Sequence, residues 1–421
     1  MSLRGLAFAY ELSKKLVMRS GFGIFYIPSM DFGDYQGLTL NGYGQTTPYV
    51  GSVNGITPTA TLSNAFPNGL IPPVGNTLGA LTNVGLSTNA ISRLRPTPYV
   101  EQWVFGFEYQ ASSNDALSAT YVGNHGVKLP YNGIEMDQLP PQYLSLGNAL
   151  LNQVPNPFYG YITSSACGLN NPTIPYGQLL RPYPEFCGVN NVQTIGASSW
   201  YDAVQFQFNH RWSHGLQFGA SFTISKYLDT SIGNSVIGTF GDSNIRNYYD
   251  LAAEKGLDIN DIPKSLVLNF VYELPFGSGK SFGANISRPL NAVLGGWQIS
   301  GIATFKDGVP LSITAVNNNT GSFGGGQRPN LVGDPHLSHP TISEWFNTSA
   351  FAQPAAYTFG NVGKTMPNLR GPGLNNWDLG IQKWWRTLNE KLQVQFRAEM
   401  FNAFNHPNFE SPNTSFGSLG S

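Results

Sequence analysis

The sequence predicts an all-β fold, an antiparallel up-and-down transmembrane β-barrel of which these 421 residues form a part. Three observations lead to this prediction. Apolar and polar residues alternate with a period of two, which is the period of a β-strand. Short and long connections between the alternating segments follow one another in turn. Charged residues make up only 11% of the chain, whereas a typical soluble domain has roughly 25%.

The stretch 201–229 shows the alternation most clearly. Phe206 and Phe208 point to one side of an extended chain, and the glutamines beside them point to the other. After a tight turn the same pattern resumes with Phe218 and Phe222, which predicts a hairpin. Similar patterns predict ten strands, at residues 3–10, 15–27, 98–110, 116–124, 200–212, 215–228, 264–274, 296–306, 376–386 and 391–402.

The lengths of the connections between these strands predict the cellular location of the barrel. In an up-and-down sheet every second connection is on the same side, so all the long loops fall at one end. Short periplasmic turns and long extracellular loops are typical of bacterial outer-membrane barrels, which predicts the outer membrane as the location. One short helix is predicted within a loop, at 246–257. The short connections are 11–14, 111–115, 213–214 and 387–390, the intermediate one is 275–295, and the long ones are 28–97, 125–199, 229–263 and 307–375.

The composition excludes several classes of protein. The net charge is −1 and no basic block occurs, so nucleic-acid binding is not expected. No run of 18 apolar residues predicts a transmembrane helix. The first 15 residues lack the apolar core of a secretory signal peptide. Because an outer-membrane protein must be exported, we expect the chain to be a piece of a longer protein.

Aromatic residues gather near the predicted strand ends, which is typical of the two membrane–water interfaces. The alternative is that aromatic residues are simply favoured in strands. The connection pattern favours the interface, so Phe206, Phe208, Phe218 and Phe222 are predicted to contact lipid, with the Gln and Ser side facing a wet lumen. The predicted girdle consists of Tyr26, Trp200, Tyr201, Trp212, Tyr227, Trp297, Trp377, Trp384 and Trp385.

The only two cysteines, Cys167 and Cys187, lie in one predicted loop. Their spacing allows a disulfide in an oxidising compartment. The alternative is that two unpaired cysteines occur there by chance.

Three longer stretches carry a family resemblance. NFVYELPFGSGKSFG (269–283) leads into LGGWQISGIATFKDGVPLSIT (294–314), and LRGPGLNNWDLGIQKWWR (369–386) leads into LQVQFRAEMFNAFNHPNF (392–409). NPFYG (156–160) precedes GQLLRPYPEF (177–186). Together they resemble the Oar-like TonB-dependent receptors of Acidobacteria. RSGFGIFY (19–26) and YVEQWVFGFEYQ (99–110) also fit the barrel of that family.

The resemblance implies an outer-membrane receptor barrel that encloses a plug domain and is energised by the periplasmic TonB system. Residues 1–421 are interpreted as one partial barrel domain, without the plug, the N-terminal domains or the final aromatic-ended strand of the family. The predicted partners are outer-membrane lipid, the plug and TonB system of the parent protein, and an unknown ligand such as a sugar, peptide or chelate.

No catalytic, cofactor-binding or metal-binding residue is predicted, and the protein is not expected to be an enzyme. GSGKS (277–281) lacks the first glycine of a phosphate loop, because Leu274 stands in its place, so a glycine-rich turn is the interpretation. The four histidines at 210, 214, 336 and 339 lack partner carboxylates at metal-site spacing and are interpreted as solvated.

Two loop segments receive similar interpretations. The acidic run 250–263 lacks the ligand pattern of an EF-hand, so a solvated loop is favoured over a loose calcium site. NNNTGSFGGGQ (317–327) is interpreted as a flexible loop tip that packs no core.

Three functions are compatible with these features. The first is energised uptake of a ligand that binds to loop aromatics. The second is adhesion or surface scaffolding, in which the loops bind a macromolecule without transport. The third is a secreted soluble β enzyme or lectin, which is disfavoured because most strands lack a charged face. The ligand-contacting candidates are Tyr159, Tyr161, Tyr176 and Tyr183, and similar loop aromatics are Tyr35, Tyr43, Tyr49 and Phe158.

Overall fold

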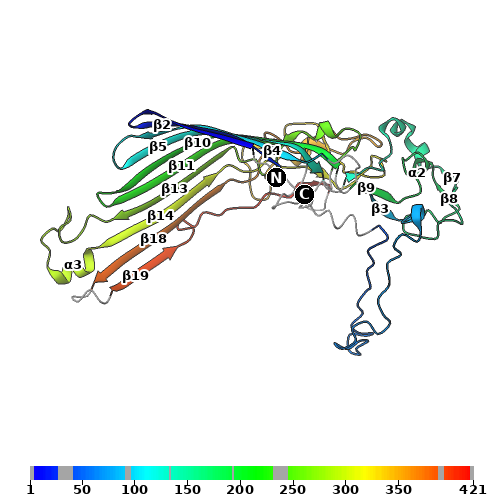
Figure 1. The fold of residues 1–421 in the computed structure, drawn as a ribbon, viewed down its shortest axis with the longest axis horizontal. Helices are drawn as coiled ribbons and strands as arrows, with labels where there is room; N and C mark the ends of the chain where they lie inside the picture. The colour runs from blue at the N-terminus through cyan, green and yellow to red at the C-terminus, as the bar shows by residue number, and fades with distance from the viewer. Residues whose placement is uncertain are drawn as a thin grey trace.

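Ten long antiparallel strands form one broad, open sheet in which each strand pairs with its neighbours in chain order (Figure 1). The structure, a computed structural model, describes residues 4–26, 41–90, 96–131, 134–191, 194–230, 245–386 and 393–417. The short strand β12 (Gly256–Leu257) adds an eleventh member beside β11. In the described residues the sheet begins at β1 and ends at β19, and the two edges do not pair with each other.

All ten predicted strands are confirmed, most of them to within two residues at each end. They are β1 (Arg4–Ser13), β2 (Leu16–Tyr26), β4 (Tyr99–Gln110), β5 (Asp115–Tyr131), β10 (Thr194–Ser213), β11 (Leu216–Asp229), β13 (Lys264–Glu273), β14 (Trp297–Lys306), β18 (Leu374–Arg386) and β19 (Gln393–Met400).

Two strands are longer than the sequence predicts by at least seven residues, and β1 ends three residues later than predicted. The strands β5 and β10 continue beyond the predicted ends and pair as far as Tyr131 with Thr194. The prediction stopped early because Gly126, Pro130 and Gly196 interrupt the alternation of side chains. The register shifts between Ile195 and Ala197, as expected where a glycine allows a bulge.

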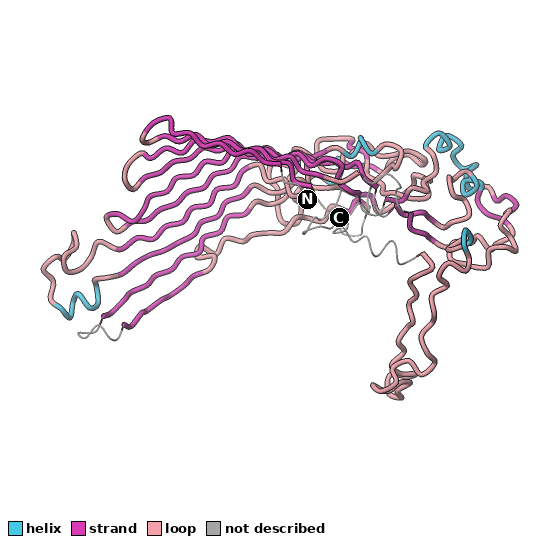
Figure 2. Tube along the Cα trace, viewed as in Figure 1, coloured by secondary structure: helices cyan, strands magenta, loops and turns pink. Residues whose placement is uncertain are grey.

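The predicted separation of turns and loops is confirmed for the described connections, whereas the predicted short connection 387–390 lies outside the described residues. The connections 14–15, 111–114 and 214–215 lie at one end of the sheet, which we call the turn end, together with 274–296. The connections after β2, β5, β11 and β14 lie at the other end, the loop end, and Figure 2 shows this separation plainly.

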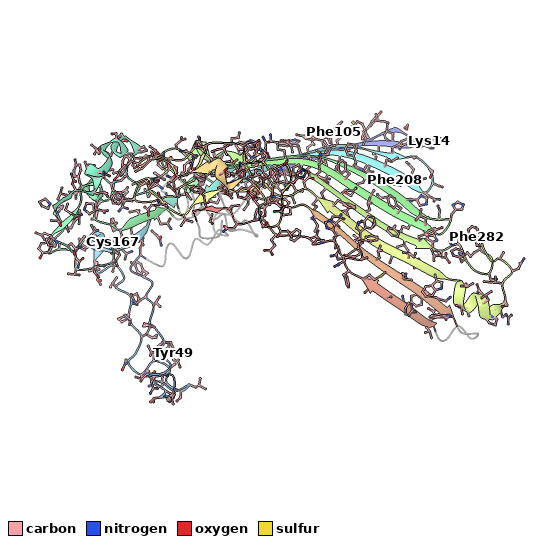
Figure 3. All side chains as sticks on the ribbon, turned by 180° about the vertical axis from the view of Figure 1, so that it is seen from behind. Lys14, Tyr49, Phe105, Cys167, Phe208 and Phe282 are labelled. Atoms are coloured by element: carbon pink, nitrogen blue, oxygen red, sulfur yellow. A yellow bond between two sulfur atoms is a disulfide. The ribbon has the colours of Figure 1, made fainter. Side chains whose placement is uncertain are left out.

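The loop end contains short elements of its own, and part of the connection after β2 projects away from the rest, with Tyr49 near its tip (Figure 3). Residues 246–257 form a single 3-10 turn followed by β12 instead of the predicted short helix. No helix among the described residues is long and apolar enough to cross a membrane. The loop-end elements are η2 (Gly79–Leu81), β3 (Ser87–Ala90), β6 (Ile134–Glu135), η3 (Pro141–Leu151), β7 (Gln153–Pro155), β8 (Thr173–Pro175), α2 (Tyr176–Leu179), β9 (Gly188–Asn191), η4 (Leu251–Glu254), β15 (Thr314–Ala315), β16 (Asn330–Leu331), η5 (Thr348–Ala350), β17 (Phe351–Ala352) and β20 (Ser415–Phe416).

Candidate functional site

The register of the sheet divides its side chains into two chemically different faces. Directly opposed residues of neighbouring strands lie on the same face. Phe206 is opposite Ala119 on one side and Phe222 on the other, and Phe222 is opposite Leu266. Followed across the sheet, this pairing defines an apolar face that includes Leu6, Phe8, Met18, Phe22, Phe105, Phe107, Leu117, Ala119, Phe206, Phe208, Ala220, Phe222, Leu266, Leu268, Ala303, Phe305, Leu379, Ile381, Phe396 and Ala398.

The opposite face, the polar face, carries mostly uncharged polar side chains. Arg19 and Glu108 form an ion pair there, with Nε and Oε1 2.9 Å apart. The same register brings Gln207 opposite Ser221 and Gln205 opposite Thr223. This is the arrangement expected of a membrane barrel, whose strands alternate apolar outside and polar inside.

Ionisable side chains interrupt the apolar face near the two ends of the strands. On β10 they are Asp202 toward the loop end and His210 toward the turn end. The eight steps between them span roughly 27 Å of extended chain at about 3.4 Å per residue. A tilted strand of this length matches an apolar band about 25 Å tall.

Aromatic residues border this band, but the predicted girdle is only partly correct. Tyr26, Trp200, Trp297 and Trp377 do lie on the apolar face. Trp200 stacks on His125 with ring centroids 5.3 Å apart, and the Lys255 Nζ lies 3.8 Å from its ring centroid. The prediction is wrong for Tyr201, Tyr227 and Trp384, which the register places on the polar face. Neighbours in a strand point to opposite faces, so residue pairs such as 200 and 201 cannot both border the band.

A shallow hollow of about 550 Å³ lies where β1, β2, β4 and β5 adjoin. Its floor is built from small residues, among them Gly5, Gly21 and Gly23. The polar-face side chains of Gln102, Asn124 and Tyr201 border it. Phe25, Val104 and Val122 also line it, so the hollow is mainly apolar although it opens on the face opposite the apolar band.

Most of the buried apolar residues lie at the loop end rather than between strands. The largest cluster belongs to the connection between β14 and β18 and includes Leu311, Phe346, Phe351 and Met366. A second cluster joins Leu129 and Tyr131 of β5 to Ile245 of another loop. Two more lie within the connection between β5 and β10. The long loops thus form a packed assembly with its own core.

Buried ion pairs join these loops to one another. Glu254, in the loop after β11, is 1% exposed and pairs with Arg328 of the loop after β14. Arg246 approaches the same carboxylate at 3.4 Å and donates to the carbonyl oxygen of Gly360 at 2.6 Å. A further pair joins Asp261 to Arg370 of the same two loops, and another joins Asp229, at the end of β11, to Lys364 of the loop after β14.

Another buried pair lies inside the connection between β5 and β10. The Arg181 Nη2 lies 2.8 Å from the Asp137 Oδ2, and both side chains are almost fully buried. The burial raises the pKa of Asp137 to about 7, although Arg181 acts in the opposite direction. Arg181 also donates through Nε to the backbone carbonyl oxygen of Asp137 and through Nη1 to Gln178. The pair thus fixes a loop segment at a desolvation cost.

A comparison with protein families agrees with this geometry. The family described as an outer membrane beta barrel domain matches residues 6–421, nearly the whole chain. The chain belongs to this outer-membrane barrel family. Its location is therefore the outer membrane, as the sequence predicts. No curated protein matches the chain.

Several solved structures resemble this barrel chain at low identity. The transporter YddB from Escherichia coli has 9% identity and a TM-score of 0.42 over 93% of this chain and 35% of its own. The FrpB iron transporter from Neisseria meningitidis has 8% identity and a TM-score of 0.39 over 98% and 37%. BauA, the ferric preacinetobactin receptor from Acinetobacter baumannii, has 9% identity and a TM-score of 0.36 over 99% and 34%. The barrel chain thus spans about a third of the length of each.

The four candidate tyrosines of the barrel chain are all accessible at the loop end. Tyr159, Tyr161, Tyr176 and Tyr183 have exposed fractions of 56%, 87%, 37% and 39%. Among the described residues, no two of these four tyrosines are in ring–ring contact. All four belong to the connection between β5 and β10. Tyr35 lies outside the described residues.

The two cysteines of the barrel chain are joined by a disulfide in the structure, with their Cα atoms 5.7 Å apart and a sequence separation of 20. The chain-entropy model gives about 3 kcal/mol for a loop of this size. Pairing in the expressed protein stays a prediction. Peptide mass spectrometry without reductant should find Cys167 and Cys187 in one linked species that disappears on reduction. Two free thiols would contradict it.

The interpretations of residues 317–327 and of the acidic run 250–263 are wrong. Within 317–327 the structure buries Thr320, Ser322 and Gln327, and Phe323 packs against a loop core. The acidic run is not solvated, because Glu254, Asp258 and Asp261 are buried and two of them are paired with arginines. Their partners lie 74 and 109 residues away in sequence, which no local pattern reveals.

His210 is half-buried rather than solvated. The His210 Nδ1 lies 2.7 Å from the Asp115 Oδ1, and the His210 Nε2 lies 2.9 Å from the Ser213 Oγ. This is the order of groups in a catalytic relay, but all three residues border two adjacent hairpin turns. The contacts fasten those turns to each other at the turn end. Among the described residues, no group of three or more His, Cys, Asp or Glu side chains is placed to hold a metal ion.

Proposed function

We propose that this chain is the barrel part of an outer-membrane receptor of the TonB-dependent, Oar-like type, which binds a ligand at its loop end for energised uptake. The observation that carries the proposal is the packed loop assembly at one end of a two-faced sheet. A barrel that only filled the membrane would not need loops joined by buried ion pairs. A receptor does, because a binding surface that is already ordered loses less entropy when the ligand binds.

The proposal assigns a role to each surface. The apolar face contacts lipid, and the polar face lines the space that a plug domain of the parent protein fills. The hollow on the polar face offers a mainly apolar surface, bordered by a few polar side chains, to the plug or the passing ligand. The exposed loop tyrosines provide rings for stacking on a sugar, peptide or chelate. In this role the chain performs no covalent chemistry.

A second candidate function is adhesion, in which the same loops bind a macromolecule and nothing is transported. The extent of exposed apolar surface on the connection after β2 favours it as the alternative. Val53, Ile56 and Leu62 there are among the most exposed apolar side chains described.

Uptake by cells that carry the complete protein tests the proposal. Cells are given a panel of labelled ferric siderophores, oligosaccharides and peptides, with and without a protonophore. At least one compound should accumulate in wild-type cells, much less in a deletion strain, and much less when the proton gradient is collapsed. Loss of surface attachment in the deletion strain, with accumulation unchanged for every compound, would favour adhesion instead.

Loop tyrosines provide a sharper variant of this test. Replacing Tyr159, Tyr161, Tyr176 and Tyr183 together by alanine should weaken binding of the transported compound at least tenfold, because each stacked ring contributes about 0.5–1.5 kcal/mol. The matched control replaces the same four residues by phenylalanine, which keeps the rings. Full binding by the alanine variant would remove these residues from the site.

A further inference from the structure

The connection between β13 and β14, residues 274–296, differs from the other described connections at the turn end. The others contain two to four residues, at 14–15, 111–114 and 214–215. This one contains the helix α3 (Arg288–Leu294), which lies at the extreme turn end of the sheet in Figure 1. A hairpin needs only two to five residues to reverse direction. The additional residues therefore have a role other than closing the turn.

Side chains from two strands hold the end of α3 in place. The last carbonyl groups of a helix have no partner within it. Here Trp385 Nε1 donates to the Ala292 oxygen and Trp297 Nε1 donates to the Val293 oxygen, both at 2.8 Å. Lys383 Nζ donates to the Val293 oxygen at 2.9 Å and also to the Gly295 oxygen.

Lys383 is the centre of this anchor. Its side chain is 1% exposed, and its Nζ lies 5.2 Å and 5.3 Å from the ring centroids of Trp297 and Trp385. The ammonium group is thus surrounded by carbonyl oxygens and aromatic rings, which together compensate for its removal from water. The position of the helix relative to the sheet is therefore well defined.

The register shows on which side of the sheet the helix is anchored. Trp297 is opposite Lys383, Lys383 is opposite Phe396, and Trp385 is opposite Val394. Phe396 and Val394 belong to the apolar face. The helix is therefore attached on the apolar side of the sheet and not on the polar side that lines the lumen.

The exposed surface of this connection is apolar and positively charged. Phe276 and Phe282 pack on each other with ring centroids 5.6 Å apart, yet remain about half exposed. The only charged residues of 274–296 are Lys280 and Arg288. The Lys280 Nζ lies 2.9 Å from the Glu273 Oε1, so Arg288 is the basic residue of this connection that is left for an outside partner. The exposed apolar side chains, with their exposed fractions, are Phe276 48%, Phe282 60%, Leu290 46%, Val293 63% and Leu294 49%.

We infer that residues 274–296 form an interfacial foot that lies in the periplasmic leaflet of the outer membrane. The exposed aromatic and aliphatic side chains enter the acyl region, and Arg288 meets lipid phosphates. The foot continues the apolar face toward the turn end, so the surface next to it is the one that meets lipid. Apolar groups on one side with basic residues among them are the features of a segment that lies in a membrane interface. The inference rests on the proposed contact of the apolar face with lipid.

Quenching of a fluorophore at three positions tests the foot. Val293→Cys, Phe206→Cys and His214→Cys are each labelled with bimane in the complete protein, reconstituted in phospholipid vesicles, with the parent protein as the blank. The quenchers are brominated phospholipid and aqueous iodide. Val293 should behave like Phe206, quenched by the lipid and protected several-fold from iodide. His214, in a two-residue turn at the same end, should show the reverse.

The outcomes separate the two claims. If Phe206 is quenched by lipid but Val293 follows His214, the apolar face meets lipid and the foot is overturned. If Val293 is reached by neither quencher, protein covers it, which also overturns the foot. If the lipid quencher does not reach the label at position 206, the apolar face of the sheet does not contact lipid, and the foot, which depends on that contact, is overturned as well.

A substitution of Lys383 tests separately whether this residue holds α3 against the sheet. Lys383→Met keeps the length of the side chain and removes the donors to α3, so iodide quenching at position 293 should rise at least twofold. Lys264→Met, at the opposite end of the sheet, is the matched control and should change nothing. An unchanged signal in Lys383→Met would show that this lysine does not hold the foot.

Discussion

Arginine in place of Phe206 is expected to destabilise the protein in a membrane by about 2–4 kcal/mol, the cost of a cation near the middle of the lipid face of a barrel. Arginine in place of Gln207 is expected to cost far less, because this side chain points to the opposite face. The two residues are neighbours on β10 and lie at nearly the same depth. Only the face differs between the two variants, so strand propensity and position along the strand are matched.

Unfolding by denaturant in phospholipid vesicles measures this difference. The midpoint should fall strongly for Phe206→Arg and little for Gln207→Arg, with unchanged slopes. Similar shifts in both variants would mean that the two faces have the same environment, which contradicts the assignment of the sheet as a membrane barrel.

Removing the charge of Glu254 is the second change with a large expected effect. Glu254→Gln should destabilise the loop assembly by about 3–5 kcal/mol, because it leaves buried arginines without their carboxylate. Arg328, which is 2% exposed, is the partner most affected, and Arg246 loses the same contact. Hydrogen exchange should become faster in residues 245–262 and 314–331 together, because the pair joins two loops.

Glu344→Gln is the matched control, since Glu344 is an exposed residue of the loop after β14. It should change stability by no more than about 0.5 kcal/mol. If Glu254→Gln left the exchange of both loops unchanged, the two loops would not depend on this ion pair. A change in only one loop would also contradict the role of the pair as a connection.

The strands could be predicted from the sequence because the side-chain pattern that determines each strand lies within the strand itself. An alternating side-chain pattern of about ten residues determines both the strand and its two faces, as in β10 and β11. The separation of turns and loops then follows from connection length alone. The extension of β5 past Gly126 and Pro130 could not be predicted, because apolar and polar side chains do not alternate there.

The loop assembly could not be predicted, because its information is not local. Glu254 and Arg328 are 74 residues apart, and each has an ordinary loop sequence around it. The same holds for the foot, where Lys383 reaches carbonyl groups about 90 residues earlier in the chain. The sequence predicts the candidate tyrosines only as aromatic loop residues, and their positions in space depend on loop packing.

The most direct test of the central claim is the chemical environment of two adjacent positions on β10. Single cysteines replace Phe206 and Gln207 in the complete protein in outer membranes, and each is exposed to a lipid-partitioning maleimide and to a membrane-impermeant, water-soluble one. We expect position 206 to react with the first reagent and to be protected from the second, and position 207 to show the reverse. Reaction of position 206 with the water-soluble reagent in the folded protein, or with neither reagent, would contradict this expectation.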